Sequence, residues 1–165
     1  MIHHTIRSTG QTFTFEQWCD HLRKKDLGEI GYIVTEYNGF HFNDSDICIN
    51  PKAMTIEVSR NNYSVTLEVA ECRGGRWSYG LNVNCGSGGF GFGCAWVGEN
   101  EGYPTENDAM IAAVDQAIVK CKHSYEYCYN NEKKVIRLIE MLEKYRKELQ
   151  QPKIVQLSLF DEFGI

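Results

Sequence analysis

The chain has 165 residues, of which 42% are hydrophobic and 24% charged, a composition that excludes a wholly disordered or low-complexity protein. Seventeen lysines and arginines oppose 22 aspartates and glutamates, and this net charge of −5 argues against non-specific binding to duplex DNA, although it does not exclude a nucleic-acid partner. No apolar run approaches the roughly 20 residues of a membrane-spanning helix, and the start of the chain does not resemble a secretory signal. Because the 7 cysteines are odd in number and scattered, we expect a cytoplasmic protein with free thiols and no membrane partner.

A short helix followed by a hairpin is predicted for the N-terminal part of the chain. Thr14 and Gln17 have the spacing of a capping box, and Gly28 stands where a helix C-cap is expected, which predicts a helix over 15–27. An Asn-Gly pair farther along the chain is the pair preferred in two-residue hairpin turns. A β-hairpin is therefore predicted over 31–43.

Two short charged runs in this part have alternative interpretations. Arg23–Lys25 lies near the expected helix end, where cations complement the helix dipole, although three adjacent cations are also compatible with a phosphate site. Asp44–Asp46 begins like a calcium-binding loop, but no glycine stands at the sixth position and no glutamate at the twelfth. A polar turn is the favoured interpretation of this second run.

The middle of the chain alternates apolar and polar residues in four segments between residues 54 and 96, which is the period of β-strands. Asn61–Asn62, Gly74–Gly75 and Gly86–Gly89 break the alternation with residues typical of tight turns. This pattern predicts a four-stranded antiparallel meander with one aromatic face and one small, polar face. The aromatic residues expected in the core are Trp77, Tyr79, Phe90 and Phe92.

A helix beginning at Thr105 is predicted to cover the aromatic face. Thr105 is a typical N-cap, and Asp108 follows it at the spacing of a capping box. A sheet whose aromatic rings face solvent would instead be typical of a platform for single-stranded nucleic acid. The apolar stripe of the helix favours burial of the rings and comprises Met110, Ala113, Val114, Ala117, Ile118 and Cys121.

Gly86–Gly91 satisfies the G-x-G-x-x-G pattern of a nucleotide-binding loop. That pattern requires a helix N-terminus after the glycines to receive the phosphates, whereas here a strand pattern continues through Phe92. Glycines at alternate positions of a strand are more typical of a close approach by another backbone or a ligand. The small, polar face of the predicted sheet is therefore a candidate ligand-binding surface. It is formed by Gly80, Asn82, Asn84, Gly91 and Gly93.

Several cysteines and one histidine could in principle form a zinc site, but their spacing does not favour it. Cys121, His123 and Cys128 lie close in sequence, and Cys85 with Cys94 could complete a set, but the spacings do not match the paired ligands of structural zinc sites. Free cysteines are commonly buried, so these thiols are predicted to fill the core. No catalytic motif is found, and we predict no catalytic residue, no metal ligand and no cofactor.

A long helix is predicted over 131–149, followed by a short tail. Its apolar stripe is too short to argue for a coiled coil, so the helix could form a homodimer or pack on its own domain. Pro152 ends the helix. The sequence thus predicts one α+β domain over 1–150 and a flexible tail over 151–165. Besides the meander and its covering helix, the fold contains the N-terminal helix and hairpin and this long C-terminal helix.

The tail contains Gln156-Leu157-Ser158-Leu159-Phe160, or Q-L-S-L-F. This segment resembles the clamp-binding motif of bacterial replication and repair proteins, whose consensus is Gln, Leu, Ser or Asp, Leu, Phe. All five positions match. The resemblance implies that these five residues bind the bacterial DNA sliding clamp, and it covers no other part of the chain.

The expected function follows from this resemblance and from the absence of a catalytic motif. We expect a non-enzymatic accessory protein of bacterial DNA replication or repair, or of a mobile element, that docks on the clamp through its tail. The alternative is a self-associating structural or ligand-binding module in which Ile154–Phe160 forms a terminal strand or packs on the domain.

Overall fold

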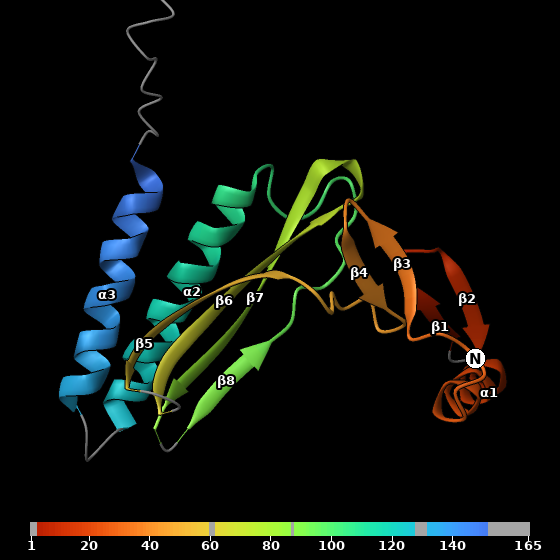
Figure 1. Cartoon of the computed structure of the whole chain (residues 1–165), viewed down its shortest axis with the longest axis horizontal. Coiled ribbons are helices and arrows are strands. Elements are labelled where there is room, and N and C mark those ends of the chain that lie inside the picture. Colours follow the sequence, from red (N-terminus) through yellow and green to blue (C-terminus); the bar gives the residue numbers. More distant parts are fainter. Residues whose placement is uncertain (1–2, 60–61, 87, 128–131, 152–165) are drawn as a thin grey trace, which may run out of the picture.

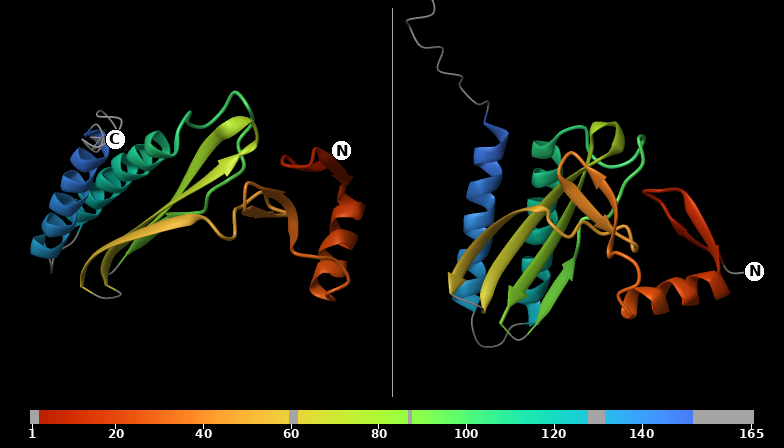
Figure 2. Two further views of the ribbon diagram at one scale, coloured as in Figure 1. Left: turned by 45° about the horizontal axis from the view of Figure 1, so that its top comes forward. Right: turned by 45° about the vertical axis from the view of Figure 1, so that its right-hand side comes forward.

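The computed structural model describes residues 3–59, 62–86, 88–127 and 132–151. It confirms the α+β class. A four-stranded sheet carries two helices on one face, and an N-terminal lobe, residues 3–43, lies at the other end of the molecule (Figures 1 and 2). No helix among the described residues combines the length and the hydrophobicity needed to cross a membrane.

The N-terminal lobe consists of two hairpins joined by one helix. Strands β1 (His3–Ile6) and β2 (Gln11–Thr14) form an antiparallel hairpin that the sequence analysis did not predict. Helix α1 (Phe15–Asp26) follows directly. Strands β3 (Ile33–Tyr37) and β4 (Phe40–Asn43) then form the predicted second hairpin.

Local sequence signals account for α1 and the second hairpin. The Thr14 hydroxyl accepts a hydrogen bond from the Gln17 amide, and the Gln17 side chain accepts one from the Thr14 amide, which is the predicted capping box. Gly28 ends the helix with φ of +71°. Asn38 and Gly39 have φ of 48° and 83°, the left-handed values that a tight hairpin turn requires.

The predicted meander is confirmed as a sheet of four antiparallel strands in sequence order. They are β5 (Lys52–Ser59), β6 (Tyr63–Cys72), β7 (Arg76–Cys85) and β8 (Gly89–Phe92). A short 3-10 turn over Arg73–Gly75 joins β6 to β7. In β6, alternate residues from Tyr63 to Val69 are buried on the face that the helices cover.

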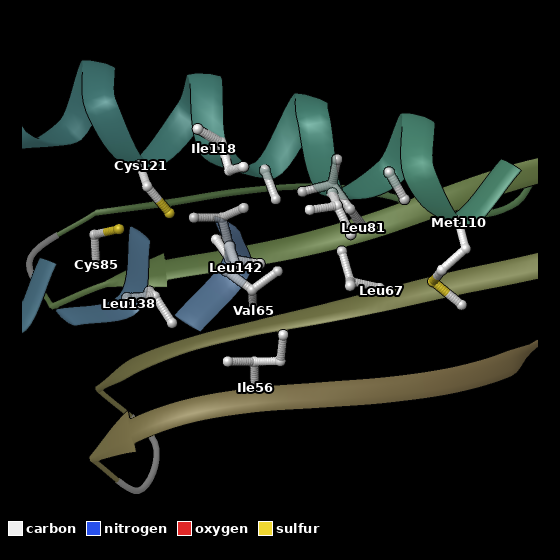
Figure 3. Packing of buried hydrophobic residues seen from close by; sticks show 14 of the residues in the cluster. Ile56, Val65, Leu67, Leu81, Cys85, Met110, Ile118, Cys121, Leu138 and Leu142 are labelled. Carbon is white, nitrogen blue, oxygen red and sulfur yellow. The ribbon is translucent and has the colours of Figure 1, made fainter. Parts of the chain in front are cut away.

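Helices α2 (Glu106–Tyr127) and α3 (Glu132–Gln150) cover this face of the sheet (Figures 1 and 3). The Thr105 hydroxyl accepts from the Asp108 amide at 3.1 Å, as predicted for the start of α2. The apolar stripe of α3 lies against its own chain, with Val135, Leu138 and Leu142 fully buried in the same cluster as the stripe of α2. Ile139, Tyr145 and Leu149 of the same helix are partly buried against this cluster, so the stripe packs mainly within its own chain.

The prediction that four aromatic residues fill this core is wrong for two of them. Phe90 and Phe92 are 39% and 41% exposed, because β8 lies beyond the area that α2 covers. Trp77 and Tyr79 are only partly buried against the cluster. The buried residues of the sheet on this side are mainly aliphatic, with Tyr63 as the one aromatic side chain among the described residues of this buried cluster.

A second hydrophobic cluster covers part of the face that was predicted to be small and polar. After Phe92 the chain leaves the sheet, and Cys94 and Trp96 turn into this cluster instead of continuing β8. The amide of Cys48 donates to the carbonyl of Cys94 at 2.9 Å, which ties the turn after β4 to this crossing segment. The cluster consists of Phe40, Phe42, Cys48, Ala70, Cys72, Cys94 and Trp96.

The small, polar face of the sheet is therefore only partly exposed to solvent. Gly80 packs against the backbone of residues 92–94, and Gly93 packs against Ile47, which agrees with the expected close approach of another backbone. Asn82 and Gly91 remain exposed. Ser78 is 5% exposed, although it was expected on the polar face, because the second cluster covers it.

Candidate functional site

The five residues predicted to bind a partner, Gln156, Leu157, Ser158, Leu159 and Phe160, lie outside the described residues. The structure does define the point from which they follow. Helix α3 ends at Gln150, and the side-chain amide of Asn107 donates to the carbonyl of Leu149 at 3.0 Å, which ties the last turn of α3 to the start of α2. The segment that carries the motif thus begins at an anchored helix end.

A groove runs between α3 and the outer strand β5. Its apolar floor comes from Met54 and Ile56 of β5 and from Met141 and Tyr145 of α3, and its volume is about 290 Å³. Charged side chains of both signs line the rim of the groove. They are Arg137, Glu140, Lys144 and Glu148. An apolar floor with a charged rim suits a short amphipathic peptide better than a small polar ligand.

A buried carboxylate joins α1 to the turn after β4. The side chain of Asp44 is 2% exposed and its Oδ2 lies 2.8 Å from Nζ of Lys25 and 3.1 Å from Nε2 of His21. The next acidic residue, Asp46, accepts from the backbone amides of Arg7 and Ser8 at 2.6 and 2.9 Å. The polar-turn interpretation of this run is confirmed, and both carboxylates act as anchors for the N-terminal lobe.

Two opposing effects act on the pKa of the Asp44 carboxyl group. Burial penalises its charged form, but hydrogen bonds from Lys25 and His21 outweigh this penalty and lower the pKa of Asp44 below its usual 3.8. All three cations of the predicted basic run form ion pairs within the N-terminal lobe or with the turn after it. Lys25 pairs with Asp44, whereas Arg23 and Lys24 both pair with Asp20.

The lowered pKa of Asp44 predicts a local loss of stability in acid. Because the pKa is lower in the folded chain than in the unfolded chain, ionised Asp44 stabilises the lobe above about pH 4, and this stabilisation is lost as the pH falls through the folded-state pKa. We expect the hydrogen-exchange protection factors of α1 to be nearly constant above about pH 4 and to decrease below it, whereas the Asp44→Asn variant should have low protection throughout. An equal decrease in both proteins would contradict this role of Asp44.

A second groove, of about 340 Å³, lies beside this centre and is lined in part by Phe13, Gln17 and His21. The His21 ring stacks on Trp18 with ring centres 5.0 Å apart, and Trp18 stacks in turn on His4. The His21 ring is thus held both by the Asp44 carboxylate and by the stacked Trp18 ring. His21 and Asp44 are 23 residues apart in the sequence, so no local motif would have revealed their contact.

The cysteine candidates are only partly brought together. Cys85 and Cys121 lie in the first cluster with their sulfur atoms facing each other (Figure 3), whereas Cys94 lies in the second cluster and Cys128 lies outside the described residues. A hydrogen bond from the Cys121 thiol lowers the pKa of Cys85 and raises that of Cys121. In the part of the chain that the structure describes, no three His, Cys, Asp or Glu residues are arranged to hold a metal.

Comparisons with known proteins add no relative. No protein-family model matches the chain, and searches of curated proteins and of solved structures found no match. The described part of the chain is thus an α+β structure with surface grooves between α3 and β5 and beside α1.

Proposed function

We propose that this protein docks on the bacterial DNA sliding clamp through Gln156–Phe160. It would act in the cytoplasm as a non-enzymatic accessory protein of DNA replication or repair, or of a mobile element. The observation that carries the proposal is the match at all five positions of the Q-L-S-L-F motif. The clamp is the partner that this resemblance implies.

The composition of the motif fits peptide docking. Leu157, Leu159 and Phe160 supply apolar side chains for a groove on the partner, and Gln156 supplies a directional hydrogen bond. Three buried anchors contribute about 5–8 kcal/mol before the cost of ordering the segment is subtracted. The expected affinity is therefore micromolar, as for a transient complex.

The described part of the chain supports this role in one respect. Helix α3 is held in the core by Leu138 and Leu142, and its last turn is tied to Asn107, so the motif follows a fixed attachment point. A fully extended chain from Gln151 to Gln156 spans at most about 18 Å. A docked clamp would therefore lie close to the C-terminal end of α3.

Replacing Leu159 and Phe160 with alanine tests the proposal. The double variant removes most of the apolar surface of the motif, so we expect its affinity for a purified bacterial sliding clamp to fall at least about 100-fold. Isothermal titration of the full chain, beside Phe163→Ala as a matched control, measures this. Phe163 is an aromatic residue of the same tail outside the motif, and its removal should leave the affinity nearly unchanged.

The unfolding free energy of the same variants separates the proposal from its alternative. If the tail instead packs on an apolar surface of the domain, such as the groove between α3 and β5, the double variant should lose stability. Under the clamp proposal, its unfolding midpoint should equal that of the parent chain. Equal clamp binding by all three proteins, or loss of folding with the double variant, would contradict clamp docking through this motif.

A further inference from the structure

Strand β8 forms one edge of the sheet, away from α3 (Figure 1). It pairs with β7 on one side, and no described strand pairs with its other side. All four of its residues, Gly89–Phe92, are exposed. The outer backbone groups of such an edge can pair with another strand.

The two edges of the sheet differ in how they are protected. Proteins commonly block an edge with charged side chains, prolines or bulges. The opposite edge, β5, begins with Lys52, carries Glu57 and has an irregular register between Glu57 and Ser59. In contrast, β8 reads Gly-Phe-Gly-Phe and contains no charge and no proline. Apart from its short length of four residues, the edge at β8 thus lacks the protective features of an edge strand.

The exposed side chains of β8 form an apolar strip on the helix side of the sheet. The rings of Phe90 and Phe92 lie 5.8 Å apart, and Phe92 lies 5.5 Å from Tyr79. The ammonium group of Lys120 stands 4.0 Å from the centre of the Phe90 ring. Phe90 and Phe92 are 39% and 41% exposed and adjoin each other, so they form a contiguous apolar contact surface at this open edge.

We infer that β8 pairs antiparallel with β8 of a second copy of this chain, about a two-fold axis at Gly91. In that register Gly91 faces its counterpart, and Phe90 of one copy lies opposite Phe92 of the other. The two apolar strips then merge on one side of a continuous eight-stranded sheet. Self-pairing is favoured because Phe90-Gly91-Phe92 is symmetric about Gly91, so a second copy places a phenylalanine opposite each phenylalanine and brings no like charges together.

The dimer should be weak. Four-residue strands bury little surface, so the interface lies at the small, transient end of protein–protein interfaces. It is distinct from pairing through α3, whose apolar stripe lies within the chain. It is also independent of clamp docking, because neither β8 nor Lys120 belongs to the proposed motif.

Sedimentation velocity of the full chain at about 10–500 µM tests this inference. The weight-average mass should rise from 18.9 kDa toward twice that value as the concentration increases. Phe92→Lys places a charge on the edge and should weaken association about tenfold or more. Phe15→Lys, at a side chain 64% exposed on α1, should associate like the parent chain. A monomer at every concentration, or equal association of Phe92→Lys and the parent chain, would overturn the inference.

A cross-link tests the register without relying on the lysine variant. An equimolar mixture of Phe90→Cys and Phe92→Cys chains should form a disulfide between positions 90 and 92 of different copies under mild oxidation, identified by mass spectrometry of proteolytic peptides. Each variant alone should form far less cross-link at its own position, because like positions are offset by two residues. An equal yield in the mixture and in the single variants would overturn the proposed register.

Discussion

Leu142→Ala is expected to lower the free energy of unfolding by about 2–5 kcal/mol. The Leu142 side chain is fully buried where α3 meets α2 and the sheet (Figure 3), so its removal leaves a cavity in the first cluster. The loss should be measurable by denaturant unfolding followed by circular dichroism. This prediction tests whether the stripe of α3 belongs to the core of its own chain.

The matched control is Ile136→Ala on the same helix. Ile136 is 41% exposed, so its replacement should change the unfolding free energy by less than about 1 kcal/mol. If α3 packs within the chain, the unfolding midpoint of Phe92→Lys, in which the proposed β8 contact is weakened, should also be nearly independent of protein concentration. Similar losses in Leu142→Ala and Ile136→Ala, or a strong concentration dependence of the Phe92→Lys midpoint, would instead indicate that α3 pairs with a second copy.

Gly80→Ala is expected to destabilise the protein by about 1–3 kcal/mol or more. A Cβ atom at this position would lie 2.7 Å from the amide nitrogen of Cys94 and 2.8 Å from the carbonyl oxygen of Phe92. Both neighbours are backbone atoms of the segment that crosses the sheet, so the whole segment must shift. The shift would also disturb the second cluster, to which Cys94 belongs.

Gly88→Ala serves as the control for Gly80→Ala. A Cβ atom at Gly88 meets no atom within 4 Å, so this change should be nearly neutral. Thermal unfolding of the two variants beside the parent chain gives the comparison. Equal melting temperatures for Gly80→Ala and the parent chain would mean that the crossing segment does not pack on Gly80 as described.

The elements with strong local signals were the ones that the sequence predicted. The capping pair of Thr14 and Gln17 and the Asn-Gly turn act through neighbouring residues, so their geometry follows from short-range chemistry. The four strands of the sheet follow from a period of two that is repeated between turns. The stripes of α2 and α3 follow from apolar residues repeated at the three- and four-residue spacing of a helix.

The features that the sequence did not predict depend on contacts between distant segments. The β1–β2 hairpin is polar, and its strands are joined by a turn at Gly10 with φ of +75° that carried no strong signal. The crossing after Phe92 continues an alternating pattern although the chain has left the sheet. Asp44 meets His21 and Lys25 only because the lobe folds back on the turn after β4.

The candidate sites also differ in whether they depend on neighbouring residues or on distant segments of the chain. The Q-L-S-L-F motif is contiguous, so it could be found from the sequence, and the structure leaves its role as a prediction. The groove between α3 and β5 and the open edge at β8 depend on tertiary packing and could be found only in the structure.

The central claim is that residues 156–160 carry the contact with the sliding clamp. Its most direct test is an isothermal titration of a purified bacterial clamp with a synthetic peptide of residues 152–165, beside the full chain. If the motif supplies the anchors, the peptide should bind in the micromolar range with an affinity within about tenfold of the full chain. Tight binding by the full chain with no detectable binding by the peptide would contradict the claim and assign the contact to the globular part.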